Sequence, residues 1–242
     1  MHYLTTVGIQ NLGGLEAGYL EKGQGSEESH EYSLHVQKIG GTLTVKRSVW
    51  LLICSAIALG LAPLMMPDSY SWVAHTTSES ASQGTEGAWM ARSGFLLFGL
   101  AVVIIADSRV QVWSPIATIS HRLFGLLMIA TAVFSSRSWI AGVAYDRIED
   151  FLHSLTASAM GFAFAIGVFA RLIDRERKRS NRVLDSMALL TSIVIPLLMY
   201  WYSHSAGLLQ RTMFAVAYVW YGAETLSTTG SNLQERRAPS NL

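Results

Sequence analysis

Long apolar stretches alternate with short polar segments along the chain from residue 48 to residue 226. The stretches 48–67 and 151–170 contain no Asp, Glu, Lys or Arg at all. A helix needs about 20 apolar residues to cross a bilayer core of ~30 Å, because it rises about 1.5 Å per residue. The pattern therefore predicts six membrane-spanning helices, at 48–67, 87–106, 115–134, 151–170, 186–202 and 208–226.

The segments around these helices divide the chain into three parts. Residues 1–45 contain glycine pairs and an acidic run but no sustained apolar period, so we expect a flexible polar arm. Residues 46–228 form the six-helix transmembrane domain, and residues 229–242 form a polar tail. Because the connections between the helices are short, one compact bundle is favoured over two membrane domains. The predicted fold class is all-α, a polytopic membrane protein.

Composition agrees with a membrane protein. Hydrophobic residues make up 50% of the 242 residues and charged residues only 14%, against roughly 25% charged in a typical globular domain. The expected partner is therefore the lipid bilayer. A formal net charge of +1 provides no basic field for nucleic acid. The single cysteine, Cys54, excludes an intrachain disulfide and every metal site built on several cysteines.

The distribution of Lys and Arg predicts the orientation. Most of these residues fall on one side of the predicted bundle: Lys46, Arg47, Arg109, the six bases in 171–182, and Arg236 with Arg237. Loops rich in Lys and Arg stay in the cytoplasm. Both termini are therefore expected to be cytoplasmic, with the loops near Gln83 and Asp146 outside.

Charged residues also lie within or at the ends of the predicted helices. Arg122 lies in 115–134, Asp107 follows 87–106, and Glu224 lies late in 208–226. A charge inside the bilayer costs at least ~2.5 kcal/mol on insertion scales, so such residues should be paired and face the bundle interior. We expect these three to be structural buried charges, with Arg122 paired to Glu224 or Asp107.

A second polar group is predicted at the outer boundary. His75 and Glu79 are spaced i, i+4, as are Glu149 and His153, and Asp150 precedes His153 by three residues. In a helix, these spacings place an acid and an imidazole on one face. The topology brings Arg92, His204 and Arg211 to the same depth.

Such a group could hold a polar ligand or support chemistry in several ways. His75, Glu79 and His153 could bind a divalent metal such as zinc, although their spacing matches no recognised zinc motif. The same groups could form an acid/base set without metal, a proton path, or a hydrogen-bonded lid over the bundle. Candidate substrate-binding residues are His75, Arg92, Glu149, His204 and Arg211.

Five glycines in the apolar segments, with Ala and Ser neighbours, fit the close helix packing that small residues allow: Gly94, Gly99, Gly125, Gly161 and Gly167.

The stretch 70–80, YSWVAHTTSES, followed by GFLLFGL at 94–100, resembles the family called domain of unknown function 998. The resemblance covers 48–226. It implies a bacterial or archaeal six-helix membrane protein, here of the bacterial inner (plasma) membrane. Its marks are Ser78-Glu79 in the first outer loop and His153 at the start of the fourth helix, with Asp146 or Asp150 as the accompanying acid. It implies a fold and a site but no reaction.

Three functions compete on this reading. The first is an intramembrane, hydrolase-like enzyme acting on a lipid-like substrate, with candidate catalytic residues Ser78, Glu79, Asp150 and His153 and with Glu79 or His153 as general base. The second is a module that binds or transports a small solute or protons. The third is a structural or assembly subunit.

Overall fold

The computed structural model describes residues 41 and 43–235, with side chains up to Ser227, and the regular structure in this part of the chain is helical. The first span is Leu43–Met65, and its last turn is the 3₁₀ helix η1 (Ala62–Met65). The other long helices are α2 (Ala88–Ser108), α3 (Pro115–Val133), α4 (Arg147–Leu172), α5 (Arg179–Trp201) and α6 (Ala206–Glu235). Two short 3₁₀ helices, η2 (Glu79–Ala81) and η3 (Ser203–Ser205), lie in the loops. The prediction of six long helices is confirmed.

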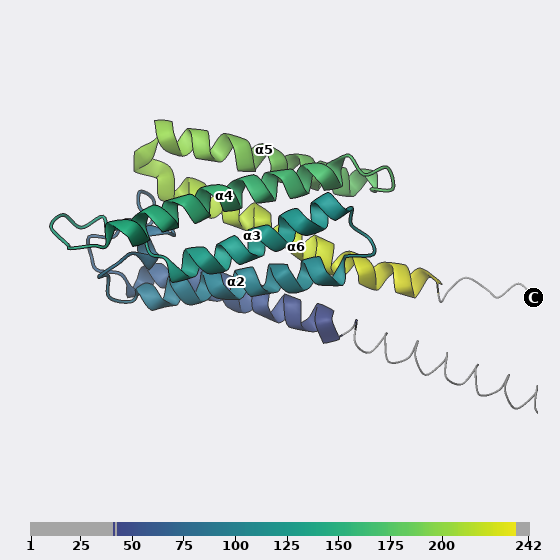
Figure 1. The fold of residues 1–242 in the computed structure, drawn as a ribbon, viewed down its shortest axis with the longest axis horizontal. Helices are drawn as coiled ribbons and strands as arrows, with labels where there is room; N and C mark the ends of the chain where they lie inside the picture. The colour runs from purple at the N-terminus through teal and green to yellow at the C-terminus, as the bar shows by residue number, and fades with distance from the viewer. Residues whose placement is uncertain (1–40, 42, 236–242) are drawn as a thin grey trace, which may run out of the picture. The chain divides into compact units, whose positions relative to one another are not determined.

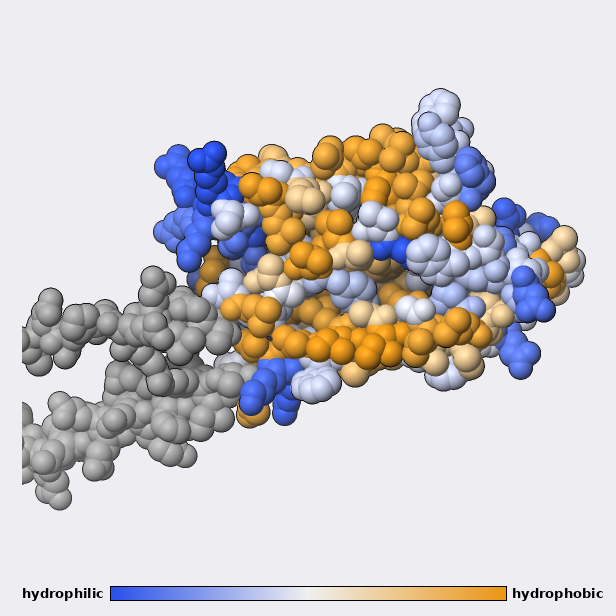
Figure 2. All heavy atoms as spheres, turned by 180° about the vertical axis from the view of Figure 1, so that it is seen from behind, coloured by the Kyte–Doolittle hydropathy of each residue, from blue (hydrophilic) through white to orange (hydrophobic). Residues whose placement is uncertain are grey.

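The helices form a multi-pass membrane bundle. The first span, α2, α3, α4 and α5 are each long and apolar enough to cross a bilayer. Helix α6 falls outside that group because Gln210, Arg211 and Glu224 interrupt its apolar sequence. Figure 2 shows a broad apolar band between hydrophilic ends, the pattern of a surface that faces lipid. Which end faces the cytoplasm stays a prediction.

Helices α4, α5 and α6 are longer than predicted, because charged residues that were assigned to the loops and the tail belong to these helices. Helix α4 begins at Arg147 because the Asp146 side chain accepts hydrogen bonds from the Ile148 and Glu149 amides and caps the helix. Helix α5 begins at Arg179, and α6 continues through the first part of the expected tail to Glu235. At the start of the domain, residues 43–45 are already helical; residues 1–40 and 42 of the expected arm and residues 236–242 lie outside the described residues.

Neighbours in sequence are neighbours in the bundle: α2 packs on α3, α3 on α4, α4 on α5, and α5 on α6 (Figure 1). The first span packs on α2 and α6. At this contact the Ser55 hydroxyl donates to the Gly94 carbonyl at 2.6 Å and also bonds the Tyr218 hydroxyl. Glycines permit the closest approach. A Cβ on Gly99 would lie 2.6 Å from the Gly125 carbonyl oxygen, so α2 and α3 touch there through their backbones.

Aromatic side chains from α2, α3 and α6 fill the interior of the bundle. Phe98 stacks on Tyr218 with ring centroids 4.4 Å apart, and the His121 ring lies 4.7 Å from Trp220. The His121 Nδ1 also bonds the Tyr221 hydroxyl at 2.8 Å. These rings are worth about 0.5–1.5 kcal/mol per pair beyond the area they bury, so they hold α6 against α2 and α3.

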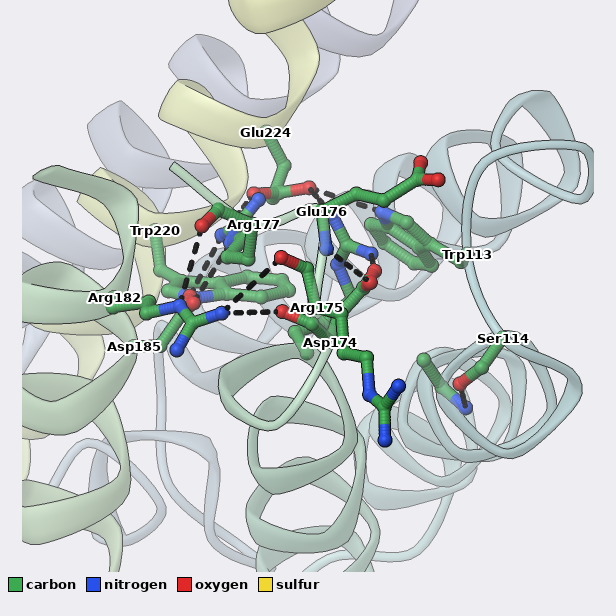
Figure 3. Close-up of polar contacts among 12 residues, drawn as sticks. Trp113, Ser114, Asp174, Arg175, Glu176, Arg177, Arg182, Asp185, Trp220 and Glu224 are labelled. Atoms are coloured by element: carbon green, nitrogen blue, oxygen red, sulfur yellow. Dashed lines mark hydrogen bonds and ion pairs between the residues drawn. The ribbon is translucent and has the colours of Figure 1, made fainter. Parts of the chain in front are cut away.

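The end of the bundle that carries loops 109–114 and 173–178, called the basic end below, contains a buried ion network (Figure 3). Arg177 donates from Nε and Nη2 to both carboxylate oxygens of Asp185, at 2.8 and 2.7 Å, and also pairs with Glu224. Arg171 pairs with Asp174 at 2.7 Å and approaches Glu224 at 3.7 Å. Two indole N–H groups complete the carboxylates' bonding: Trp220 donates to Asp185 and Trp113 to Glu224.

This network ties four segments together. Trp113 precedes α3, Arg171 ends α4, Asp185 lies in α5, and Glu224 lies in α6. Burial alone would lower the pKa of Arg177, but its hydrogen bonds to Asp185 and Glu224 outweigh burial and raise that pKa above the ordinary value. The guanidinium therefore keeps its charge, and the buried carboxylates keep a cation beside them.

The expected roles of the three structural charges are corrected in part. Arg122 does pair with Asp107, at 2.6 Å, but their side chains are 44% and 54% exposed, so neither faces the bundle interior. Glu224 is buried, and its cations are Arg171 and Arg177. The hydropathy pattern could not choose between these partners because the rotation of each helix depends on packing.

We expect Glu224→Gln to destabilise the protein strongly, because it leaves Arg177 and Arg171 short of a buried counter-charge. Losing one member of a buried pair costs about 3–5 kcal/mol, whereas an exposed pair contributes about 0–1 kcal/mol. The matched control is Asp107→Asn, which breaks the exposed Arg122 pair. Thermal unfolding in detergent should show a large drop in Tm for Glu224→Gln only, and equal drops would contradict the assignment.

Candidate functional site

A polar cavity of about 530 Å³ lies at the opposite end of the bundle, called the long-loop end below because it carries loops 66–87 and 134–146. Its walls come from these two loops and the first turns of α4. The four predicted catalytic residues all line it: Ser78, Glu79, Asp150 and His153. Arg137, Trp139 and Tyr145 line it too, and the sequence pattern did not indicate them.

Glu79 is held in a tight turn of the first loop. Its Oε2 accepts the backbone N–H of Thr76 at 2.6 Å and the Thr76 hydroxyl at 2.9 Å, while the Glu79 N–H donates back to Thr76 Oγ1 at 3.1 Å. Such reciprocal bonds fix the turn as a capping box fixes a helix start. In the described part of the chain, the other carboxylate oxygen, Oε1, accepts no hydrogen bond.

Helix α4 presents Asp150 and His153 to the cavity from its first two turns. Asp150 Oδ1 accepts the Arg137 N–H at 2.8 Å, and neighbouring Glu149 accepts the Ser135 N–H at 2.8 Å. His153 Nδ1 bonds the Phe134 carbonyl oxygen at 2.8 Å. Three side chains of α4 thus hold the backbone of 134–137, the segment that forms one wall of the cavity.

The bond from His153 to Phe134 determines its tautomer. A carbonyl oxygen can only accept, so Nδ1 must carry the proton, and a neutral ring then has its lone pair on Nε2. The side chain is buried, at 5% exposure, and lines the cavity. The ring is therefore set up as an acceptor or a base.

The first loop is anchored on α6. The Gly207 and Leu208 amides, which have no partner within the helix, donate to the Ala74 and Val73 carbonyls at 3.2 and 3.0 Å. Arg211 donates to the Trp72 and His75 carbonyls at 2.8 and 2.9 Å and to the Tyr70 hydroxyl at 2.6 Å. Burial raises the pKa of Tyr70, so its hydroxyl stays protonated.

Gln83 joins the two loops to each other. Its side chain accepts the Asp146 N–H at 2.7 Å and donates to the Ser135 carbonyl at 2.8 Å, while its own N–H donates to the Ser136 carbonyl at 2.9 Å. The loops that surround the cavity are therefore one hydrogen-bonded unit. A single glutamine in a polar loop gives no sign of this role in the sequence.

None of the five residues expected to bind substrate lines the polar cavity. Arg211 and Glu149 hold loop backbone as described above, and Arg92 donates to the Ala81 and Ser82 carbonyls at 3.0 and 3.4 Å. His75 packs against Tyr70 and Trp139, and His204 is exposed beside Tyr202. Loop backbone near a bilayer must find partners, and these side chains supply them.

The expected metal trio of His75, Glu79 and His153 is not assembled. Among the residues that the structure describes, no three His, Cys, Asp or Glu side chains are grouped so that they could hold a metal ion. The helical spacing argument does not apply to His75, because 66–78 forms turns, and its Nδ1 accepts the Ser71 N–H at 2.8 Å. Within residues 43–227, the side chains of this trio therefore do not assemble the metal site that the sequence allowed.

Of the two acids that could accompany His153, only Asp150 lines the cavity, because Asp146 caps α4. A second, apolar cavity of about 630 Å³ lies beside the polar one, between α4, α5 and α6. The hydropathy pattern could not indicate it, because a cavity depends on which faces of the helices meet.

No curated protein and no solved structure matches this chain. A family model described as "Protein of unknown function (DUF998)" matches residues 48–226, a range that reaches from the first span into α6 and includes both loops of the polar cavity. The resemblance seen in the sequence is thereby confirmed, and the chain belongs to the DUF998 family of proteins of unknown function.

Proposed function

We propose that this membrane protein binds the polar part of a lipid-like molecule in the cavity at the long-loop end. The observation that carries the proposal is the convergence of Ser78, Glu79, Asp150 and His153 on one cavity of about 530 Å³. Ligand sites are concave, with a few placed polar groups, and typically have volumes of about 300–1,000 Å³. A pocket at the end of a membrane bundle lies at the boundary between water and lipid, where the polar groups of lipids reside.

The side chains in the cavity favour a ligand rich in hydrogen-bond donors. Glu79 Oε1, Asp150 Oδ2 and His153 Nε2 are acceptors that no hydrogen bond from the described residues occupies. The cavity is lined by two carboxylates and one arginine, Arg137, and this excess of negative charge disfavours a phosphate monoester. The polar group that fits best carries hydroxyls or an ammonium, as a sugar or an ethanolamine headgroup does.

A hydrolase reaction is the second candidate, and the tautomer of His153 favours it. With Nδ1–H committed to Phe134, Nε2 can take a proton from a cavity water while the water oxygen attacks an ester carbonyl carbon. The carbonyl–alkoxide bond then breaks, and the leaving oxygen receives that proton.

The other two alternatives have less support. A proton or solute path from His153 toward the basic end would pass Thr156 and Thr131, 3.2 Å apart, and would then meet the packed rings of Phe124 and Phe164. Arg122, which was expected to face the bundle interior in that half, is 44% exposed and pairs with Asp107, so it offers no inner end for such a path. A purely structural subunit has no need of two cavities.

Binding should depend on the free carboxylate oxygens. We expect the protein in phosphatidylcholine vesicles to bind spin-labelled phosphatidylethanolamine at least tenfold more tightly than spin-labelled phosphatidylcholine, whose headgroup has no N–H donor. Glu79→Gln or Asp150→Asn should remove most of this preference, since a hydrogen bond to a charged group contributes about 1.5–3 kcal/mol. Glu86→Gln is the control, because Glu86 is an exposed acid of the first loop that does not line the cavity. If both lipids bind equally to the unmodified protein, a donor-bearing headgroup is wrong.

Hydrolysis is tested by His153→Asn, whose side-chain N–H can still donate to the Phe134 carbonyl while the base at Nε2 is gone. We expect release of fatty acid or headgroup from phosphatidylethanolamine vesicles, followed by mass spectrometry, to fall about 10²–10⁴-fold with binding retained. Absence of product from the unmodified protein would remove the enzyme candidate and leave the binding proposal in place.

The proposal also places the cavity on the external side. Reporter fusions after Lys178 should give a cytoplasmic signal, and fusions near Gln83 an external one, because the bases of 171–182 outnumber those of the opposite loops. An external signal at Lys178 would mean that the orientation is the reverse of the predicted one and that the cavity lies at the cytoplasmic face.

A further inference from the structure

The apolar cavity of about 630 Å³ lies at mid-depth in the bundle, in the half nearer the long-loop end. One wall is the face of α4 that carries Ala157, Gly161 and Ala165, spaced i, i+4 and i+8. The opposite walls are α5 around Pro196 and α6 around Ala217, with rings from α2 and α3 behind them. Three side chains on its rim, Phe162, Ile193 and Leu197, are more than half exposed, so the cavity opens sideways between α4 and α5.

Gly161, on this wall, does not serve close helix packing. A Cβ on Gly99, Gly125, Gly94 or Gly167 would collide with a neighbour at 2.6–2.8 Å, so those four glycines allow close contact as expected. A Cβ on Gly161 would meet nothing within 4 Å. The expectation that Gly161 belongs to the packing set is therefore wrong, and its missing side chain enlarges the cavity instead.

The lining shows what can occupy this space. Only Ser158, Ser192 and Gln210 place polar side chains on it, and the Ser192 hydroxyl is turned back to the Leu189 carbonyl at 2.8 Å. A buried water needs two to four polar partners, so water is a poor occupant. An empty apolar cavity of this size would be destabilising. At this depth in a bilayer, the surrounding solvent consists of acyl chains.

One side chain, Gln210, lies between the two cavities, which have no lining residue in common. Gln210 lines the apolar cavity, and its Oε1 accepts the N–H of Thr77 at 2.7 Å and, more weakly, that of Ser78 at 3.4 Å. Ser78 lines the polar cavity. One molecule with a polar head and an apolar tail would thus lie on both sides of the Gln210–Ser78 contact.

We propose that the apolar cavity holds one acyl chain of the lipid whose headgroup occupies the polar cavity, entering sideways between α4 and α5. The head-and-tail assignment rests on the proposed function, because the polar cavity supplies the headgroup site. Gln210 marks the junction of head and tail, and the open face of α4 at Gly161 determines how much chain fits.

The test introduces a large side chain at Gly161, where the cavity has space for it. Gly161→Phe places a ring in the cavity, and Gly60→Phe is the matched control, since a Cβ on Gly60 also meets nothing within 4 Å but that residue lies on the exposed face of the first span. The probes are spin-labelled dipalmitoyl-phosphatidylethanolamine and the short-chain dibutyryl compound. Gly161→Phe should weaken binding of the long-chain probe at least tenfold and leave the short-chain probe unchanged, because only the chain loses its site.

The outcomes separate the two proposals. Weakened binding of both probes by Glu79→Gln, with loss of only the long-chain probe in Gly161→Phe, supports the pair. If Gly161→Phe and Gly60→Phe bind the long-chain probe alike, the chain site is overturned while the headgroup site stands. If Glu79→Gln changes neither probe, the headgroup site fails and the chain site is judged on Gly161→Phe alone. Should Gly161→Phe unfold, Ala157→Leu on the same face gives the same comparison.

Discussion

The site at the long-loop end depends on the hold that α4 has on the loop before it. Three side chains in its first two turns each form a 2.8 Å hydrogen bond to one backbone group of that loop. Glu149 accepts the Ser135 N–H, Asp150 accepts the Arg137 N–H, and His153 donates to the Phe134 carbonyl. Irregular backbone at the edge of a bilayer cannot rely on water, so it must be satisfied by protein groups. The same bonds shape the cavity wall, and no hydrogen bond from the described residues occupies the second oxygen of Asp150 or the Nε2 of His153. Structure and candidate chemistry are therefore consequences of the same contacts.

The two ends of the bundle use charge differently. At the basic end, the charges of Arg171, Arg177, Asp185 and Glu224 pair with one another and join α4, α5 and α6. At the long-loop end, each carboxylate that lines the cavity spends one oxygen on backbone and keeps the other. Polar groups in excess of what the fold needs are what distinguish a site from a structural cluster.

Because polar contacts hold both ends of the bundle together, the apolar cavity can remain in its middle. The contacts of α6 with the rest of the bundle run through large rings such as Phe98 on Tyr218 and through the ion network. With α4, α5 and α6 held at the basic end and α6 held by the loop at Gly207 and Arg211, small residues on α4 need not be closed over by a neighbouring helix. Glycine thus has two roles in this bundle, contact at Gly99 and space at Gly161.

The sequence alone determined the six long helices, five of which are apolar enough to cross a bilayer, because hydrophobic length is a local property of the chain. It also indicated Ser78, Glu79, Asp150 and His153, through spacing and family marks, and these four do line one cavity. It could not assign partners. Arg122 pairs on the outer surface, and nothing in the sequence distinguishes Asp185 from the charged loop residues before it. Gln83 and Gln210 belong to no sequence motif that would indicate their hydrogen bonds. Rotation of each helix about its axis, the folding of 66–78 into turns, and the space beside Gly161 arise only when helices distant in sequence pack. The tertiary structure therefore decided which charges are buried, which acids are free, and where a cavity remains.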